Sequence, residues 1–352
     1  MLLITDQLLQ SAFALRKAEP WELLNDSNVL AVSLSSGVIA YCCVMGHAGS
    51  HHSLGIYEGA DRFSTYLKTL ELSKLSQFDS HQSVMTFDCI NCDFMQAADL
   101  DNTKKQPVRD FAQRHNLSIP RKFGWPDVTR FSPGLVPWPL TSEHDVAVAI
   151  EAMDAATWLT GLLRADIALA EKIGLKLGDE CDYPTFGGGK VVPLLVALGD
   201  GNYRIESTKL PPVKDIYYQP KPLEADVVKH LRSLKAVGDY QALYYHIPLP
   251  VNEGDVEVPF YQGLIILYDN DEGILEPAMQ NDADPDGVLM SLAAVLLDYG
   301  SRPKSLTVGD KRTAVMLADF CSQCGIKLIV SAKQAEDVHQ AAQLMIDMMK
   351  MM

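Results

Sequence analysis

The sequence predicts a mixed α/β (α+β) protein with two domains. A chain of 352 residues is long enough for two domains of ordinary size. Short β-branched runs alternate with segments of helical periodicity, and residues 210–222 carry four prolines in thirteen positions, which is typical of a linker. We therefore expect an N-terminal α+β domain over residues 1–212, a proline-rich linker over 213–222 and a C-terminal α/β domain over 223–352.

The N-terminal domain is expected to begin with a helix followed by three strands. Apolar residues at helical spacing, such as Phe63, Tyr66 and Leu70, support a helix after these strands. Glycines between the strands supply the turns. The expected elements are a helix over 6–24, strands over 29–34, 38–45 and 52–57, a helix over 61–75, a strand over 83–89 and a helix over 108–115.

A proline- and tryptophan-rich passage covers residues 123–140, and its prolines argue against a helix or a central strand there. Thr141 and Ser142 can cap a long helix that reaches about Lys172. Residues 191–207 are expected to form a hairpin around the turn Gly199-Asp200-Gly201-Asn202.

The C-terminal domain is expected to alternate strands with helices after an opening meander. The expected elements are a helix over 223–235, strands over 242–249, 263–268 and 273–279, a helix from Asp284 to Tyr299, a strand over 304–308, a helix from Asp310 to Gly325, a strand over 326–330 and a helix over 335–349. After the first helix the order is β-β-β-α-β-α-β-α, which resembles the ribonuclease-H-like fold. Parallel pairing is expected among the later strands, so the sheet should be mixed.

Two stretches resemble sequences of a known family. The first runs from Trp21 through His52-Ser53-Leu54-Gly55-Ile56-Tyr57 to Pro133-Gly134 and Pro137-Trp138, and the second is Arg302-Pro303-Lys304-Ser305-Leu306-Thr307-Val308 followed by Cys324-Gly325-Ile326. Together they resemble uncharacterised bacterial proteins with paired domains of unknown function, which are sometimes found beside plasmid ORF-3-like proteins. The resemblance covers most of the chain and implies no particular activity.

Residues 303–331 also resemble the middle of an integrase or transposase catalytic domain. In that family an Asp that ends this strand binds a divalent metal beside an Asp on the first strand. Asp310 fits the former role, and Asp269 and Asp298 are conceivable helpers. The expected first strand, which includes Ala242-Leu243-Tyr244-Tyr245-His246-Ile247, contains no carboxylate. This departure argues against nuclease chemistry, since phosphoryl transfer needs clustered carboxylates to hold Mg²⁺.

The charge balance argues against nucleic acid as a partner. With 30 Lys and Arg against 45 Asp and Glu, the net charge is −15, and such a surface repels phosphate backbones. One basic cluster, Arg302, Lys304, Lys311 and Arg312, is a place where a phosphate could dock. Residues 236–301 contain twelve Asp or Glu and no Lys or Arg. We interpret this stretch as a solvated acidic face or as the contact surface for a basic protein partner.

The compartment is expected to be the cytoplasm. Seven cysteines, an odd number, fit reduced thiols better than a disulfide framework. The first residues lack a basic segment followed by an apolar core, so no signal peptide is expected. No uninterrupted apolar run reaches the roughly 18 residues that a membrane span needs, so no membrane partner is expected.

Four further motifs favour structural roles, and no cofactor is expected. Asp282-x-Asp284-x-Asp286-Gly287 matches half of a calcium loop, but Ala293 stands where the bidentate Glu belongs. His47, His51 and His52 lack a complete ligand set for zinc. Cys89 and Cys92 have an odd strand spacing that places them on opposite faces, and Cys321 and Cys324 share one helix stripe in a core pattern, so both pairs are expected to be structural. Gly187-Gly188-Gly189-Lys190 precedes a strand, whereas a phosphate loop opens a helix.

These observations favour a non-catalytic cytoplasmic protein that acts by binding a protein or a small ligand. The alternative is a divalent-metal-dependent phosphoesterase or nuclease of ribonuclease-H-like type, centred on Asp310. The two differ in a single geometric respect, because the enzyme needs at least two carboxylates within a few ångströms of Asp310.

Overall fold

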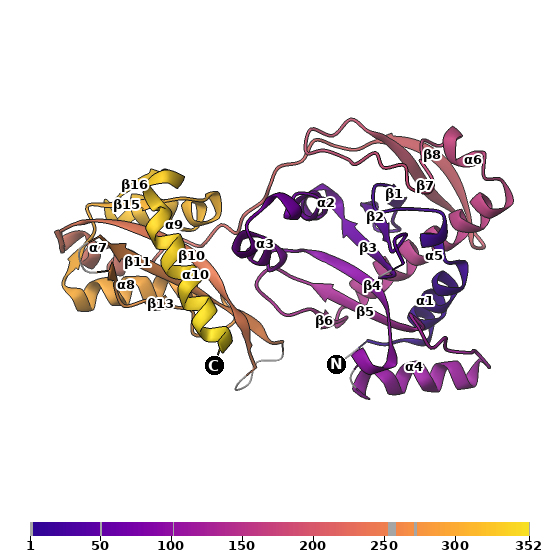
Figure 1. Cartoon of the computed structure of the whole chain (residues 1–352), viewed down its shortest axis with the longest axis horizontal. Helices are drawn as coiled ribbons and strands as arrows, with labels where there is room; N and C mark the ends of the chain where they lie inside the picture. Colours follow the sequence, from indigo (N-terminus) through magenta and orange to yellow (C-terminus); the bar gives the residue numbers. More distant parts are fainter. Residues whose placement is uncertain (1–2, 50, 101, 253–257, 271–272, 352) are drawn as a thin grey trace. The chain divides into compact units, whose positions relative to one another are not determined.

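The computed structural model describes residues 3–49, 51–100, 102–252, 258–270 and 273–351. The protein is a mixed α/β chain that forms two compact units, each built on a mixed sheet (Figure 1). Unit 1 comprises Met1–Leu72, Phe87–Ser132 and Pro137–Asp215. Unit 2 comprises Ser73–Thr86, Pro133–Val136 and Ile216–Met352.

Unit 1 contains an eight-stranded sheet in the order β6-β5-β4-β3-β2-β1-β7-β8. Neighbouring strands are antiparallel except for β1 and β7, which are parallel. The strands are β1 (Val29–Ser33), β2 (Ile39–Met45), β3 (Ser53–Glu58), β4 (Cys89–Met95), β5 (Trp125–Phe131), β6 (Trp138–Pro139), β7 (Val191–Gly199) and β8 (Asn202–Lys209).

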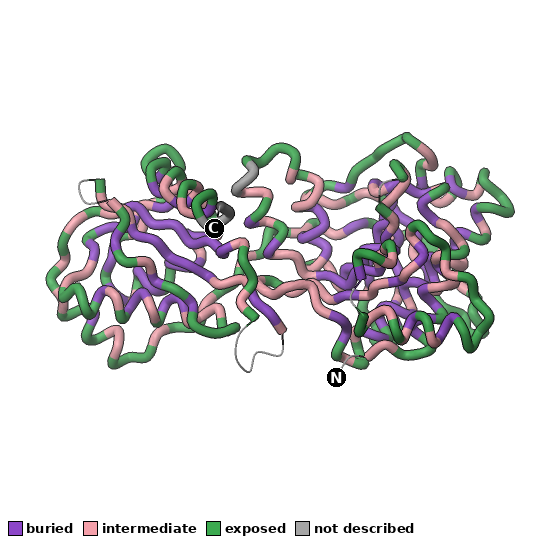
Figure 2. Tube along the Cα trace, turned by 60° about the horizontal axis from the view of Figure 1, so that its bottom comes forward, coloured by how far each residue is buried: buried purple, intermediate pink, exposed green. Residues whose placement is uncertain are grey.

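Helices cover both faces of this sheet. The helices of unit 1 are α1 (Asp6–Ala18), α2 (Gly59–Thr69), α4 (Asn102–Arg114), α5 (Glu143–Ala165) and α6 (Leu169–Lys172), with the 3₁₀ turns η1 (Pro20–Glu22) and η3 (Ala97–Asp99). α1 and α5 bury their apolar faces against one side, and α2 packs Phe63 and Tyr66 against the other. The inner strands are accordingly buried (Figure 2). Ser142 caps α5 as the sequence predicts, by accepting a hydrogen bond from the Asp145 N–H.

α5 is long and apolar enough to cross a membrane by length and composition. Its buried side chains, which include Ala149, Met153 and Leu159, instead lie in the core of unit 1 among side chains from β1 to β4. A core helix passes the same test of length and apolarity, so this helix is weak support for a membrane span.

Unit 2 contains a sheet in the order β12-β11-β10-β15-β16, and β13 also pairs with β11. The β10–β15 and β15–β16 pairs are parallel, whereas β10–β11, β11–β12 and β11–β13 are antiparallel. The strands are β9 (Lys235–Ala236), β10 (Asp239–Val251), β11 (Phe260–Asp269), β12 (Gly273–Ile274), β13 (Ala278–Met279), β14 (Ser301–Arg302), β15 (Ser305–Val308) and β16 (Lys327–Val330).

The two faces of this sheet are covered by different helices. The helices of unit 2 are α3 (Gln77–Val84), α7 (Ala225–Ser233), α8 (Gly287–Tyr299), α9 (Lys311–Cys324) and α10 (Glu336–Met351), with the 3₁₀ turn η4 (Ala332–Ala335), and η2 (Leu72–Lys74) spans the division between the units. α7, α8 and α9 pack against one face, and α10 packs against the other. Asp310 caps α9 and Gly325 ends it with φ +67°, which confirms the predicted helix bounds.

Two short segments from the first half of the sequence belong to unit 2 rather than to the first domain that we expected over 1–212. The Tyr261 N–H donates to the Gly134 carbonyl, and the Val136 N–H donates to the Pro259 carbonyl, so residues 133–136 extend the pairing of β11. The Gly134 N–H donates in turn to the Met85 carbonyl, which ties residues 73–86 to the same region.

Two expected strands differ from the structure, and β5 was not among the expected elements. Residues 83–89 do not form one strand, because Ser76 caps α3 and the helix continues to Val84. Residues 273–279 form two short strands, and Pro277, which lacks an N–H, lies between them. Pro126 lies within β5 and still agrees with the argument against a central strand, since β6 pairs only with Thr129 and Arg130 and leaves β5 an edge strand at Pro126.

Residues 210–224, which include the expected linker, contain no helix or strand. Both ends of this segment are held by ion pairs. Lys68 binds Asp215 in unit 1 at 2.6 Å, and Lys221 binds Asp286 in unit 2 at 3.3 Å.

Candidate functional site

Asp310 lies between the end of β15 and the start of α9, at the carboxyl edge of the parallel strands. Its Oδ1 accepts a hydrogen bond from the Thr313 N–H at 2.8 Å, and its Oδ2 accepts one from Thr313 Oγ1 at 2.6 Å. Thr313 Oγ1 also accepts a hydrogen bond from the Tyr244 N–H of β10 at 3.0 Å. The carboxylate therefore caps α9 and, through Thr313, fixes the helix to the central strand.

The other two candidate metal ligands do not lie beside Asp310. Val308 pairs with Ala242, which places Asp310 level with Tyr244. Asp269 pairs with Gly273 at the end of the antiparallel β11. The strand register places Asp269 about four residues, or about 13 Å, from the level of Asp310, towards the amino end of β10. Asp298 is exposed in the last turn of α8. Within the described residues, no group of three or more His, Cys, Asp or Glu side chains is arranged to hold a metal ion.

His339 Nε2 lies 3.9 Å from Asp310 Oδ2 at this edge. A polar cluster of His246, Tyr244, Gln82 and Arg312 also converges there. The Gln82 amide nitrogen donates to the His246 carbonyl, and its oxygen accepts from the His246 N–H, both at 2.8 Å. The same oxygen accepts from Arg312 Nη1 at 3.2 Å. Tyr244 Oη lies 3.1 Å from His246 Nε2. This polar cluster is buried, with His246 only 7% exposed.

The electrostatics of the cluster do not suit a cation. Burial, and secondarily the charge of Arg312, lower the pKa of His246 to about 3, so the ring is neutral near pH 7. Burial raises the pKa of Tyr244 to about 12, so its hydroxyl stays protonated and can donate to His246 Nε2. His246 Nδ1 then carries the hydrogen, and it has no hydrogen-bond partner in the described part of the chain. Arg312 supplies a positive charge where a metal site would need negative ligands.

Sequence reasoning did not identify this cluster. Gln82 lies 164 residues from His246, so no local spacing connects them. One signal in the sequence could have indicated it: His246 lies inside an apolar, β-rich run, and a buried histidine requires polar partners.

The basic residues near Asp310 do not form one phosphate site. Arg302 Nη1 donates to the Gly325 carbonyl, and Arg312 is bound to Gln82. Lys304 precedes β15 whereas Lys311 follows it, so the length of the strand separates them.

The aspartates of the Asp282-Asp284-Asp286 motif have partners within the protein. Asp282 Oδ1 accepts from the Asp284 N–H and Asp284 Oδ1 accepts from the Asp286 N–H, which are turn contacts. Asp286 binds Tyr218 Oη at 2.8 Å and the side chain of Lys221 at 3.3 Å. The motif therefore begins α8 and anchors residues 218–221.

The histidine and glycine motifs of unit 1 also have structural contacts. His47 donates to the Trp21 carbonyl, His51 lies 3.0 Å from a carboxylate oxygen of Asp93, and His52 stacks on the Trp21 ring. Lys190, after the glycine run, donates to the Ser27 and Asp182 carbonyls and holds residues 182 and 27 together.

The cysteines are free thiols, and six of the seven are buried. Cys89 and Cys92 belong to the cores on opposite faces of the sheet, as their spacing predicts. Burial raises the pKa of Cys42 and Cys89 to about 12, which leaves them unreactive as nucleophiles near neutral pH.

We expect Cys181, which is exposed, to be the one thiol that reacts rapidly with Ellman's reagent at neutral pH. The remaining six should react only after denaturation. Absorbance at the nitrothiobenzoate band measures both phases, and Cys181→Ser should abolish the fast one. A fast phase of two or more thiols would contradict the buried placement.

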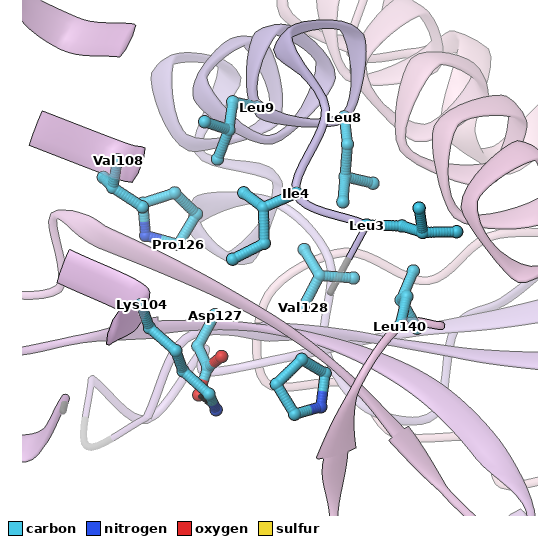
Figure 3. Close-up of a pocket in the computed structure, with 11 residues that line it drawn as sticks. Leu3, Ile4, Leu8, Leu9, Lys104, Val108, Pro126, Asp127, Val128 and Leu140 are labelled. Carbon is cyan, nitrogen blue, oxygen red and sulfur yellow. Dashed lines mark hydrogen bonds and ion pairs between the residues drawn. The ribbon is translucent and has the colours of Figure 1, made fainter. Parts of the chain in front are cut away.

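Unit 1 has a small cavity and a larger open groove. One cavity of about 20 Å³ lies beneath Leu3 and Ile4 and is bordered by the Lys104–Asp127 ion pair (Figure 3). It has space for about one water molecule. A second, open groove of about 450 Å³ lies between residues 3–7 and α5, with Glu143 and Glu151 among its polar residues.

Three of the exposed acidic side chains of unit 2 flank one helix. Asp282 and Asp284 are exposed just before α8, and Asp298 is exposed in its last turn. Between them α8 exposes Met290 and Leu297. Exposed apolar strips are typical of interaction surfaces.

Comparison with known proteins divides the chain at a similar place. Residues 6–175 match the model of a domain of unknown function (DUF7309), and residues 229–343 match the model of another (DUF6930). No curated protein matches the chain. No solved structure matches it. The chain thus carries two domains of unknown function, DUF7309 followed by DUF6930, in agreement with the resemblance to paired domains of unknown function.

Proposed function

We propose that the protein is a non-catalytic cytoplasmic binding protein whose partner is a basic protein that contacts the acidic surface of unit 2. The observation that carries this proposal is the apolar strip of α8 between exposed aspartates. The absence of any Lys or Arg over residues 236–301 adds to it, because complementary charge steers association and selects partners. Free thiols are consistent with a reducing compartment.

The proposal includes a ribonuclease-H-like scaffold for unit 2 and a bacterial origin among proteins found beside plasmid ORF-3-like proteins. The strand order β12-β11-β10-β15-β16, with parallel β10–β15 and β15–β16 pairs, supports the scaffold. Fold analogy alone carries no activity. In this scaffold Tyr244 and His246 occupy the first strand, where the metal-dependent enzymes of the resemblance carry an Asp.

The alternative, a metal-dependent phosphoesterase or nuclease, is disfavoured by the contacts of Asp310. Both of its carboxylate oxygens are bound to Thr313, and the helper aspartates lie elsewhere on the sheet and on α8. Arg312, which follows the capping position, is held by Gln82. The overall charge of −15 also disfavours a nucleic-acid substrate.

We expect calorimetric titration with Mn²⁺ or Mg²⁺ to show no micromolar binding, and Asp310→Ala to leave the titration unchanged. The same substitution should lower the free energy of unfolding by about 0.5–2 kcal/mol, because the N-cap of α9 is lost. Asp310→Asn keeps an oxygen that can cap the helix and should recover most of that loss. Micromolar metal binding that disappears in Asp310→Ala would reverse the preference between the two functions.

A further inference from the structure

α8 is apolar on nearly all sides, yet one of its faces is uncovered. Its sequence, GVLMSLAAVLLDY, has Ser291, Asp298 and Tyr299 as its only polar side chains. Val288, Leu289, Leu292, Ala293 and Leu296 are buried in the core of unit 2. A helix that is hydrophobic all round is normally buried all round.

The uncovered face follows the helical repeat. Met290, Ala294 and Leu297 stand at positions i, i+4 and i+7, so they share one stripe, and all three are exposed. Met290 is 45% exposed and Leu297 38% exposed. We call Met290, Ala294 and Leu297 the α8 stripe.

Acidic groups stand at both ends of the α8 stripe. Asp282 and Asp284 are exposed before its first turn, and Asp298 is exposed in its last. Two positively charged side chains near α8 have other contacts: Lys221 is paired with Asp286, and Arg232 of α7 donates to the Gln323 carbonyl on α9. The 13 residues of α8 span about 20 Å, so the two acidic ends are about that far apart.

We propose that the α8 stripe is the docking surface for an amphipathic basic helix of a partner protein, an inference that rests on the binding function proposed above. The partner's apolar face covers Met290 and Leu297, and its Lys or Arg side chains reach the aspartates at the two ends. Exposed methionine adapts its shape to varied apolar surfaces, as in other proteins that bind helices through anchors at i, i+3, i+4 and i+7.

The test uses two synthetic peptides of about 16 residues, long enough to span the stripe as a helix. Both contain the same leucines and lysines. In the first, leucines follow the i, i+3, i+4, i+7 pattern, and in the second they are scrambled. Fluorescence anisotropy with the full chain should show micromolar binding of the patterned peptide and binding at least about tenfold weaker for the scrambled one.

Substitutions in the stripe should remove this preference. Met290→Ser combined with Leu297→Ser should weaken binding of the patterned peptide at least about tenfold, because its leucines lose the apolar side chains that they contact. Leu344→Ser on α10 is the matched control, since Leu344 is 64% exposed and lies outside the stripe. This control should bind the peptide like the original chain. Unchanged melting temperatures show that both variants fold.

The outcomes separate this inference from the function on which it rests. A second outcome combines three results: both peptides bind equally, the stripe variant has no effect, and Asp282→Asn with Asp284→Asn weakens binding. In that case the proposed docking surface is wrong, whereas the proposal of a basic partner stands. If neither peptide binds below about 100 μM, both proposals fail. If sedimentation shows a dimer that Met290→Ser dissociates, the occupant is a second copy of this chain, and the inference is overturned.

Discussion

Acidification from pH 6.5 towards pH 3 is expected to destabilise unit 2 by on the order of 5 kcal/mol through His246 alone. Burial and the nearby Arg312 lower the folded-state pKa of this histidine from 6.5 to about 3. In the unfolded chain the ring takes up a proton near pH 6.5. The unfolded state therefore binds the proton first as the pH falls, and stability present above pH 6.5 is lost progressively down to about pH 3.

The measurement is urea denaturation of the full chain followed by circular dichroism at several pH values across this window. His246→Gln removes the titrating group and can keep a polar contact with Tyr244, so its stability should fall less on acidification. His230→Gln, on the exposed part of α7, is the matched control and should retain the full acid sensitivity. Equal pH dependence in the original chain and in His246→Gln would show that the buried imidazole is not the acid-sensitive group.

Trp21→Ala is expected to lower the stability of unit 1 by about 3–5 kcal/mol. Trp21 is only 2% exposed, and its ring stacks on His52 at 4.5 Å between centroids and contacts Phe94 at 5.2 Å. Arg16 also lies over the ring, at 5.7 Å from its centroid. Removal of the indole leaves a cavity and separates the turn after α1 from the sheet.

Thermal and urea unfolding followed by circular dichroism measure this loss without depending on the fluorescence of the deleted indole. Trp21→Phe preserves a ring in the stack and should lose less stability than Trp21→Ala. Leu198→Ala, at an exposed position of β7, should change stability by less than about 0.5 kcal/mol. A loss below about 1 kcal/mol in Trp21→Ala would mean that the site collapses around the missing ring.

Local signals in the sequence predicted many helices and strands but fewer of their contacts. Caps at Ser142 and Asp310 and the left-handed Gly325 were read correctly, because each depends on one or two neighbouring residues. The strand at Pro126 was missed because a proline is tolerated wherever its strand lacks a neighbour, and strand order is not a local property.

The candidate site was predicted even less completely, for the same physical reason. Asp310 was correctly placed at the end of a strand and the start of a helix, but its binding to Thr313 follows from the capping geometry. The Gln82 contacts with His246 join α3 to β10, which are far apart in the sequence, so no local pattern predicts them. The exposed face of α8 could be read only after the structure showed which of its apolar sides was covered.

Because residues 73–86 and 133–136 belong to unit 2, unit 2 cannot be produced whole as a single C-terminal fragment. A fragment that starts after the proline-rich segment lacks Gln82, so the His246 N–H and carbonyl lose their amide partner. It also lacks the residues that pair beside Phe260 and Tyr261. During synthesis, more than a hundred further residues are added after α3 before β10 is made. The contact between α3 and β10 therefore forms late and closes a long loop of the chain. The two sheets therefore do not correspond to two consecutive stretches of the sequence, and expression of the C-terminal stretch alone yields an incomplete unit 2.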